Sequence, residues 1–168
     1  MLWLVGMMGS GKSTIGRRVA SRVGADFVDT DELVAAVTDS SIAELWSEEG
    51  EEEFRRLESQ MLASAASDDG VVVATGGGVV LDDDNIDLMR RSGRVVWLKA
   101  APEVLAARLG RDSTRPLLAE AEDPVAVLRD LLAKREERYE RAAHTIVDTG
   151  ELTIDQAVEE VLAQWNRS

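Results

Sequence analysis

Eight consecutive residues near the start of this chain have the types and the spacing needed to hold a phosphate group. Positions 6–13 read Gly-Met-Met-Gly-Ser-Gly-Lys-Ser, which fills every defined position of the pattern G-x-x-x-x-G-K-[ST]. Glycines allow a backbone to turn its N–H groups inward around an anion. In this pattern Lys12 reaches the β- and γ-phosphates of a nucleotide, and the hydroxyl of Ser13 is a ligand for Mg²⁺. The sequence therefore predicts a nucleotide site that also holds magnesium.

Two carboxylates, Asp29 and Asp31, form the second candidate group. They follow a short strand predicted over residues 25–28, and open parallel sheets bind their ligands at the carboxyl ends of strands. Capping of the next helix by Asp29 or Thr30 is an alternative, but a cap does not require both aspartates. The pair therefore lies where a ligand or a metal ion is expected.

Three consecutive glycines, Gly76, Gly77 and Gly78, follow an apolar strand predicted over residues 71–75. A tight turn needs one or two glycines, so we interpret three as a close approach of the backbone to a ligand, with a plain turn as the alternative. Enzymes with this phosphate loop often carry a magnesium-binding aspartate at the end of such a strand. None follows this strand directly, so Asp29 on the neighbouring strand becomes the candidate.

The chain is strongly acidic, with 19 Lys and Arg against 32 Asp and Glu and a formal net charge of −13. Nucleic acids and anionic membranes require an extended positive surface, so neither is expected as a partner. An acidic chain that binds a polyanion must concentrate its few cations at the site. The glutamates within residues 48–53 are more typical of a solvated helix face than of a metal cluster.

Four arginines near predicted loops or helix ends are candidate ligands. Arg55 could simply pair on the surface with Glu58, three residues further along the same predicted helix. Arg115 lies within residues 111–124, a polar segment with little periodicity that we interpret as a mobile lid. Arg135 lies near the apolar edge of its predicted helix. The four candidates are Arg55, Arg108, Arg115 and Arg135.

Five short strands alternate with helices, which predicts an α/β fold in a single domain, residues 1–168. We expect a parallel, five-stranded sheet with right-handed crossovers and helices on both faces. Residues 31–60 and 111–124 look like insertions over one end of it. Strands are predicted at residues 2–5, 25–28, 71–75, 94–98 and 145–147, and helices at 14–23, 31–37, 41–47, 51–65, 82–91, 103–109, 124–142 and 153–165.

The sequence contains no cysteine, so disulfides and thiolate metal sites are excluded. Neither a signal-peptide pattern nor an apolar run of membrane-spanning length is found. We therefore expect a soluble, cytoplasmic protein.

Six segments, in their order and spacing, resemble the shikimate kinases. They are Gly-Met-Met-Gly-Ser-Gly-Lys-Ser at 6–13, Asp-Thr-Asp at 29–31, Glu-Phe-Arg-Arg-Leu-Glu at 53–58, Gly-Gly-Gly at 76–78, Arg-Pro-Leu-Leu at 115–118 and Lys-Arg-x-x-x-Tyr at 134–139. The resemblance covers nearly the whole chain. It implies a three-layer P-loop fold with a lid, and transfer of the γ-phosphate of ATP to the 3-hydroxyl of shikimate in aromatic amino acid biosynthesis. It also implies Mg²⁺ as cofactor and a monomer whose partners are these two substrates.

The resemblance further implies a role for each matching residue. ATP would be bound by Gly9, Ser10, Gly11, Lys12, Ser13, Thr14, Arg108 and Arg115. Shikimate would be bound by Asp31, Arg55, Gly76, Gly77, Gly78 and Arg135. Ser13 would bind Mg²⁺ directly and Asp29 would do so through water. Lys12, Asp31 and Arg115 would be catalytic, with Asp31 as the base or orienting group at the reacting hydroxyl.

Three other functions remain open at this point. A gluconate kinase would share the phosphate loop but has no need for Arg55 and Arg135 beside the glycines at 76–78. A nucleoside monophosphate kinase would carry a different arginine pattern in its lid and base-binding regions. A nucleotide-binding module without turnover could dispense with Asp31, Arg55 or Arg115. The loop at residues 148–152 lacks the arginine that some shikimate kinases use near adenine.

Overall fold

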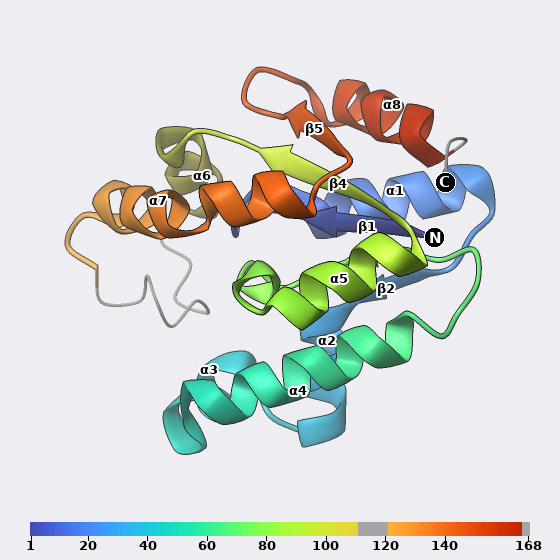
Figure 1. Ribbon diagram of the computed structural model, residues 1–168. Helices are drawn as coiled ribbons and strands as arrows, with labels where there is room; N and C mark the ends of the chain where they lie inside the picture. The colour runs from blue at the N-terminus through green and yellow to red at the C-terminus, as the bar shows by residue number, and fades with distance from the viewer. Residues whose placement is uncertain (111–120, 166–168) are drawn as a thin grey trace.

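The centre of the molecule is a sheet of five parallel strands in the order β2-β3-β1-β4-β5 (Figure 1). The computed structural model describes residues 1–110 and 121–165. The strands are β1 (Leu2–Val5), β2 (Phe27–Asp29), β3 (Val72–Ala74), β4 (Arg94–Lys99) and β5 (Thr145–Asp148). The four apolar residues of β1 are completely buried, as expected of a central parallel strand covered on both faces.

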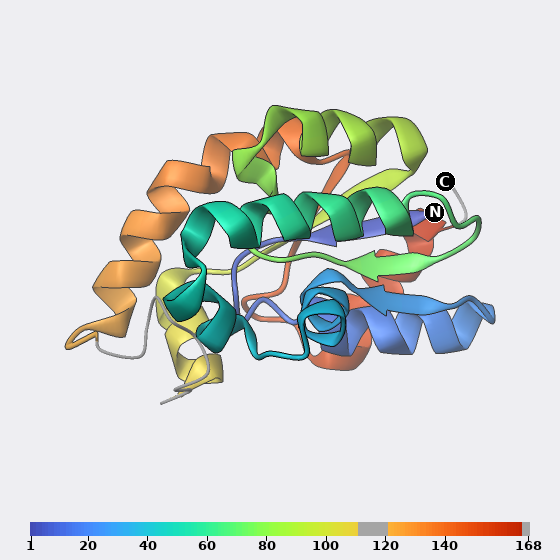
Figure 2. The ribbon, with the colours of Figure 1, turned by 90° about the horizontal axis from the view of Figure 1, so that it is seen from below.

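Helices cover both faces of this sheet and create three layers (Figure 2). The helices are α1 (Lys12–Val23), α2 (Thr30–Thr38), α3 (Ile42–Glu48), α4 (Gly50–Ala65), α5 (Asp83–Ser92), α6 (Pro102–Leu109), α7 (Pro124–Ala142) and α8 (Ile154–Trp165), with a 3₁₀ turn η1 (Val79–Leu81). Successive side chains of a strand point to opposite faces of the sheet. Leu2 and Leu4 therefore pack with α1 and α8, whereas Trp3 and Val5 pack with α4, α5 and α7.

The α/β fold with a five-stranded parallel sheet is confirmed, although the second strand begins at Phe27 rather than at residue 25. Gly24 ends α1 in the left-handed region with φ 67°, and the N–H of Ala25 donates to Ala20 O. These residues complete the end of the helix and are therefore unavailable to the strand. At its other end, β2 includes Asp29, which pairs with Ala74 of β3.

The predicted insertion at residues 31–60 corresponds to α2, α3 and the first part of α4. These helices share a small apolar cluster around Val34, Leu45 and Phe54, separate from the two clusters that cover the sheet. Because α2 follows β2 directly, the cluster anchors this unit beside the carboxyl ends of β2 and β3 (Figure 1).

Most of the predicted lid, residues 111–124, lies outside the described residues, and so does Arg115. Residues 121–123 lead into α7, where the Asp123 side chain caps the helix by accepting from Ala126 N at 3.1 Å. Within residues 1–110 and 121–165, none of the helices has the length and apolar character that crossing a membrane requires.

Candidate active site

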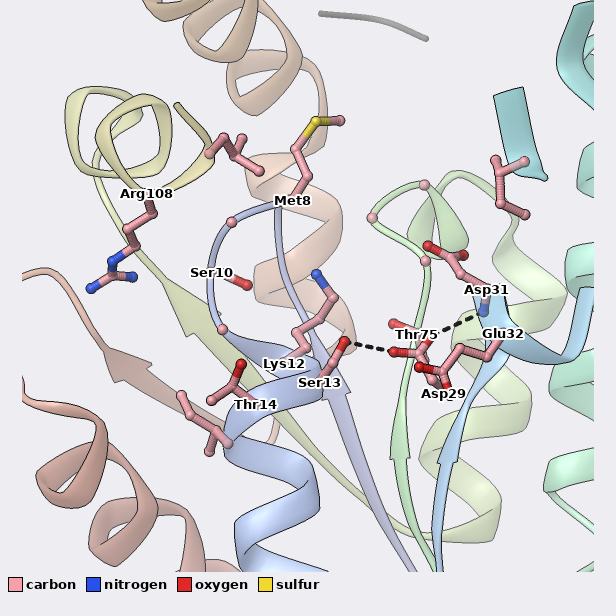
Figure 3. A pocket seen from close by; sticks show the side chains of 18 of the residues that line it. Met8, Ser10, Lys12, Ser13, Thr14, Asp29, Asp31, Glu32, Thr75 and Arg108 are labelled. Carbon is pink, nitrogen blue, oxygen red and sulfur yellow. Dashed lines mark hydrogen bonds between the residues drawn. The ribbon is translucent and has the colours of Figure 1, made fainter. Parts of the chain in front are cut away.

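The loop after β1 and the ends of β2 and β3 border a cavity of about 910 Å³ (Figure 3). This is the edge at which parallel sheets bind their ligands. Every predicted site residue that the structure describes lines this cavity. These residues are Gly9, Ser10, Gly11, Lys12, Ser13, Thr14, Asp29, Asp31, Arg55, Gly76, Gly77, Gly78, Arg108 and Arg135. Residues of α1, α2, α4, α6 and α7, of the end of β2 and of the loops after β1 and β3 are thus brought to one place.

The phosphate loop is closed by its own lysine. Lys12 Nζ donates to Gly6 O and to Met7 O, both at 2.9 Å. Gly9 and Gly11 have φ of 78° and 95°, which a residue with a Cβ rarely adopts. Ser10 is only 1% exposed, and its Oγ has no hydrogen-bond partner among the described residues. An unpartnered buried hydroxyl in a cradle of N–H groups fits a phosphate oxygen.

A serine and a carboxylate meet at the foot of the loop. Ser13 Oγ donates to Asp29 Oδ2 at 2.6 Å, and Asp29 Oδ1 accepts from the N–H of Asp31 at 3.0 Å (Figure 3). Asp29 therefore caps α2 and also contacts the loop, so capping and ligand binding are compatible for this residue. A hydroxyl and a carboxylate are the hard oxygen ligands that Mg²⁺ prefers.

The glycine turn after β3 is packed against charged side chains. A Cβ on Gly76 would lie 2.1 Å from Glu58 Oε1 and 2.8 Å from Asp31 Oδ1. A Cβ on Gly78 would lie 2.1 Å from an Arg55 guanidinium nitrogen. The protein's own acidic and basic groups therefore lie close to the backbone at Gly76 and Gly78, and the predicted close approach of a ligand stays a prediction. Gly77 differs, since a Cβ there would make ordinary contacts of 3.5 Å or more.

Arg55 is held by acids and aromatic rings where the cavity meets the glycine turn. Its Nη1 donates to Glu58 Oε2 at 2.7 Å and its Nη2 to Glu51 Oε1 at 3.3 Å. The guanidinium carbon lies 5.1 Å from the ring centroid of Phe54 and 5.5 Å from that of Trp46. These contacts fix the guanidinium group with one side against the glycine turn.

Arg135 approaches the same turn from α7, where it is only 5% exposed. Its Nη1 donates to Gly77 O at 3.2 Å. The arginines on α4 and α7 therefore meet the turn at successive residues, Gly78 and Gly77. Paired guanidinium groups fixed in this way are suited to a planar carboxylate.

Arg108 lies at the opposite end of the cavity, where α6 ends. Its Nη1 donates to Thr149 Oγ1 at 3.0 Å, and its Nη2 donates to Thr149 O. Thr149 is itself fixed, because its N–H donates to Lys99 O at 2.8 Å at the end of β4. Arg108 and the loop after β5 thus form one wall of the cavity, with Leu152 and Ile154 adding apolar surface.

Glu58 is the site residue whose importance the sequence analysis missed. The predicted pairing with Arg55 exists, but Glu58 is 1% exposed rather than on the surface. Burial raises the pKa of Glu58, and the Arg55 cation opposes this shift. The signal was present in the sequence, since residue 58 falls on the apolar stripe of α4, four residues after Phe54 and four before Leu62.

Solved structures place this fold in a known class. A shikimate kinase from Acinetobacter baumannii in complex with shikimate matches 96% of this chain, and 89% of its own, with a TM-score of 0.92 and 35% identity. A gluconokinase from Sinorhizobium meliloti matches with a TM-score of 0.57 at 19% identity, which shows the fold alone. The strand order, with the phosphate loop after the central strand, defines a P-loop kinase.

Sequence comparison then identifies the family within this class. The family model described as shikimate kinase matches residues 8–166. The shikimate kinase of Caldanaerobacter subterraneus subsp. tengcongensis is 43% identical over 96% of this chain and 94% of its own, and that of Symbiobacterium thermophilum is 44% identical over 95% and 92%. The chain belongs to the shikimate kinase family and is an ATP-dependent phosphotransferase of the shikimate pathway. The resemblance noted in the sequence is confirmed.

Proposed function

We propose that this chain, as a single monomeric domain, transfers the γ-phosphate of ATP to the 3-hydroxyl of shikimate with the residues that line the cavity. The observation that carries the proposal is the convergence of three groups on one glycine turn: the Asp31 carboxylate at Gly76 and the guanidinium groups of Arg55 and Arg135 at the next two residues. A base beside paired cations suits an acceptor that carries both a hydroxyl and a carboxylate.

The nucleotide binds, in this proposal, with its phosphates in the loop at residues 6–13. The Ser10 hydroxyl, which has no hydrogen-bond partner within residues 1–110 and 121–165, and the N–H groups around Gly9 and Gly11 hold the phosphate oxygens. Lys12 neutralises charge on the transferring group. Arg108, fixed by Thr149, packs against the adenine ring.

At the acceptor end, Arg55 and Arg135 bind the carboxylate of shikimate through paired N–H donors. The glycine turn at residues 76–78 lines the ring, and Asp31 binds the hydroxyl groups. An alcohol is a poor nucleophile, so a carboxylate within hydrogen-bond reach orients it and accepts its proton as transfer proceeds. Most of the rate comes from alignment and charge neutralisation, because phosphoryl transfer leaves the protein little covalent work.

Magnesium is part of the proposal because the Ser13 hydroxyl would bind it directly and the Asp29 carboxylate, which accepts from Ser13 Oγ at 2.6 Å, would reach it through water. Among the described residues there is no cluster of three or more His, Cys, Asp or Glu side chains able to hold a metal ion alone. That agrees with Mg²⁺ in nucleotide sites, which binds one or two protein ligands together with phosphate oxygens. Held by Ser13 and Asp29, Mg²⁺ would supply positive charge that offsets the charge of the phosphates.

Replacing Asp29 by asparagine tests the magnesium site. Asparagine caps a helix as well as aspartate does, so α2 should be preserved while the charge is lost. We expect the Mg²⁺ concentration for half-maximal activity to rise by about tenfold. Asp82→Asn is the matched control, because Asp82 caps α5 in the same way, with Asp84 N at 2.8 Å from its Oδ1, and does not line the cavity. Equal Mg²⁺ requirements for both variants would contradict the role of Asp29.

Alanine at Gly78 is expected to weaken shikimate binding selectively. The new Cβ would overlap the Arg55 guanidinium, which then has to leave its place against the turn. The KM for shikimate should rise by about tenfold or more, while the KM for ATP changes little. Gly93→Ala is the matched control, because a Cβ there would also meet a close contact, 2.6 Å from Met1 O, at a residue that does not line the cavity. An equally large shikimate effect in Gly93→Ala would mean that the displacement of Arg55 is not the cause.

A coupled assay for ADP release tests the overall proposal. ADP should be released when shikimate is added and not when gluconate or a nucleoside monophosphate replaces it. Nucleotide binding without acceptor-dependent release would favour a binding module over an enzyme. Arg115, which we propose reaches the phosphates, lies outside the described residues, and its role stays a prediction.

A further inference from the structure

Tyr139 is a buried polar side chain to which the function proposed above assigns no role. It lies on α7, is completely buried, and stacks on Trp97 of β4 with ring centroids 5.4 Å apart and an interplanar angle of 18°. Its hydroxyl donates to Gly77 O in the glycine turn. Stacking leaves the ring little freedom, so the position of the hydroxyl is fixed by the core of the protein.

Two side chains of α7 therefore hold one carbonyl. Arg135 precedes Tyr139 by four residues, which places both on the same face of the helix, and Arg135 Nη1 also donates to Gly77 O at 3.2 Å. A backbone carbonyl oxygen has two lone pairs, so it accepts both bonds. The turn is tied to α7 at its middle residue, between the residues that contact Glu58 and Arg55.

The hydroxyl of Tyr139 is a permanent donor. Burial raises its pKa, and the nearby Arg135 cation opposes this shift only in part. The group is therefore protonated at neutral pH. Gly77 O is held by a neutral donor that does not titrate, in addition to a charged one.

We propose that Tyr139 is a positioning residue for the acceptor pocket, which fixes the Gly77 peptide and, through it, the guanidinium group of Arg135. The inference rests on the proposed role of Arg135 in binding the shikimate carboxylate. Arg135 and Gly77 are among the described residues that line the cavity, whereas Tyr139 is not. Tyr139 thus acts from behind the pocket wall, without touching either substrate.

Because the peptide bond is planar, the hydrogen bond from Tyr139 to Gly77 O also affects the surface of the glycine turn that faces the cavity. The C=O of Gly77 and the N–H of Gly78 belong to one rigid plane and point in opposite directions. Anchoring the carbonyl to α7 therefore sets the direction of the Gly78 N–H and the surface on which Arg55 rests. Without the hydroxyl of Tyr139, only Arg135 would donate a hydrogen bond to Gly77 O, and its guanidinium group would be less available to bind a ligand.

Tyr139→Phe removes the hydroxyl and keeps the stacked ring. We expect the KM for shikimate to rise by about three- to tenfold, with kcat and the KM for ATP within about twofold of wild type. The methyl ester of shikimate keeps the hydroxyl groups and lacks the charge. The preference of the enzyme for shikimate over this ester, measured as a ratio of kcat/KM values, should therefore fall in Tyr139→Phe.

Ser92→Ala is the matched control, because Ser92 Oγ accepts from Trp3 Nε1 at 3.1 Å in another part of the core. Tyr139→Phe removes the hydrogen bond to Gly77 O, and Ser92→Ala removes the bond from Trp3 together with the one that Ser92 Oγ donates to Leu88 O at 2.8 Å, so both variants should lower Tm. Only Tyr139→Phe should change the KM for shikimate. If both variants change it equally, or if Tyr139→Phe raises the KM for ATP as much as that for shikimate, the role of Tyr139 is merely structural and the inference is overturned.

Arg135→Lys, alone and combined with Tyr139→Phe, separates this inference from the proposed function. Lysine lacks the paired donors of arginine, so the single variant should raise the KM for shikimate, and the double variant should raise it by less than the product of the two single effects. An unchanged KM in Arg135→Lys would refute the proposed role of Arg135. A raised KM in Arg135→Lys with an unchanged KM in Tyr139→Phe would refute the role of Tyr139 alone.

Discussion

Asp31→Asn is expected to lower kcat by about 10²- to 10⁴-fold while ATP binding is retained. Asparagine has nearly the same shape as aspartate but cannot accept the proton of the acceptor hydroxyl. The Asp31 side chain projects from the first turn of α2 toward Gly76 (Figure 3). The substitution therefore removes a carboxylate from the place where we propose that the hydroxyl of the acceptor binds. Steady-state kinetics with shikimate and isothermal titration with ADP measure the two effects separately.

Asp39→Asn provides the matched control for this experiment. Asp39 ends the same helix, has a φ of 51°, and does not line the cavity. Asparagine tolerates the left-handed region well, so the fold of α2 should be unaffected. A kcat for Asp31→Asn within threefold of the Asp39→Asn value would show that Asp31 is not the base or orienting group.

Lys12→Met is expected to lower kcat by about 10³-fold or more and to weaken nucleotide binding as well. Two effects combine here. The positive charge at the transferring phosphate is lost, and so are the two hydrogen bonds at 2.9 Å by which Lys12 closes the loop onto Gly6 and Met7. Both kcat and the affinity for ADP should therefore fall, unlike in Asp31→Asn.

Lys99→Met controls for the removal of a positive charge near the sheet edge. Lys99 ends β4 and pairs with Glu136 at 2.7 Å, but its side chain does not line the cavity. Its loss should leave kcat and nucleotide affinity close to wild type, since partly exposed ion pairs contribute little. If Lys12→Met and Lys99→Met had similar kinetics, overall charge rather than the phosphate loop would control the rate.

The parts of this fold that the sequence predicted are those governed by local rules. The phosphate loop is recognisable because its glycines and lysine have a fixed spacing, and the buried run at residues 2–5 marks the central strand. The convergence of Asp29, Asp31 and the glycine turn also followed from one rule, that parallel strands place their carboxyl ends at the same edge. These inferences needed no knowledge of which helix packs on which.

Features that depend on packing between distant elements were not predictable in this way. The burial of Glu58 depends on α4 packing against the turn after β3, and the anchoring of Arg108 depends on Thr149, 41 residues away. The end of α1 displaced the start of the second strand because the Ala25 N–H bonds back to the helix. In each case the deciding partner is remote or belongs to the backbone, and no short sequence pattern reports it.

The charged side chains around the glycine turn restrict how the acceptor range of this enzyme could be redesigned. Any side chain added at Gly76 or Gly78 would collide with the Asp31 carboxylate or the Arg55 guanidinium group, which we propose bind the acceptor, so narrowing this wall should lower affinity. Ile42 of α3 is a more permissive position, because it lines the cavity while only partly buried and, unlike Trp46, is not among the residues that hold Arg55. Libraries aimed at bulkier or smaller cyclic acids should therefore vary Ile42 and leave Trp46 and the turn intact.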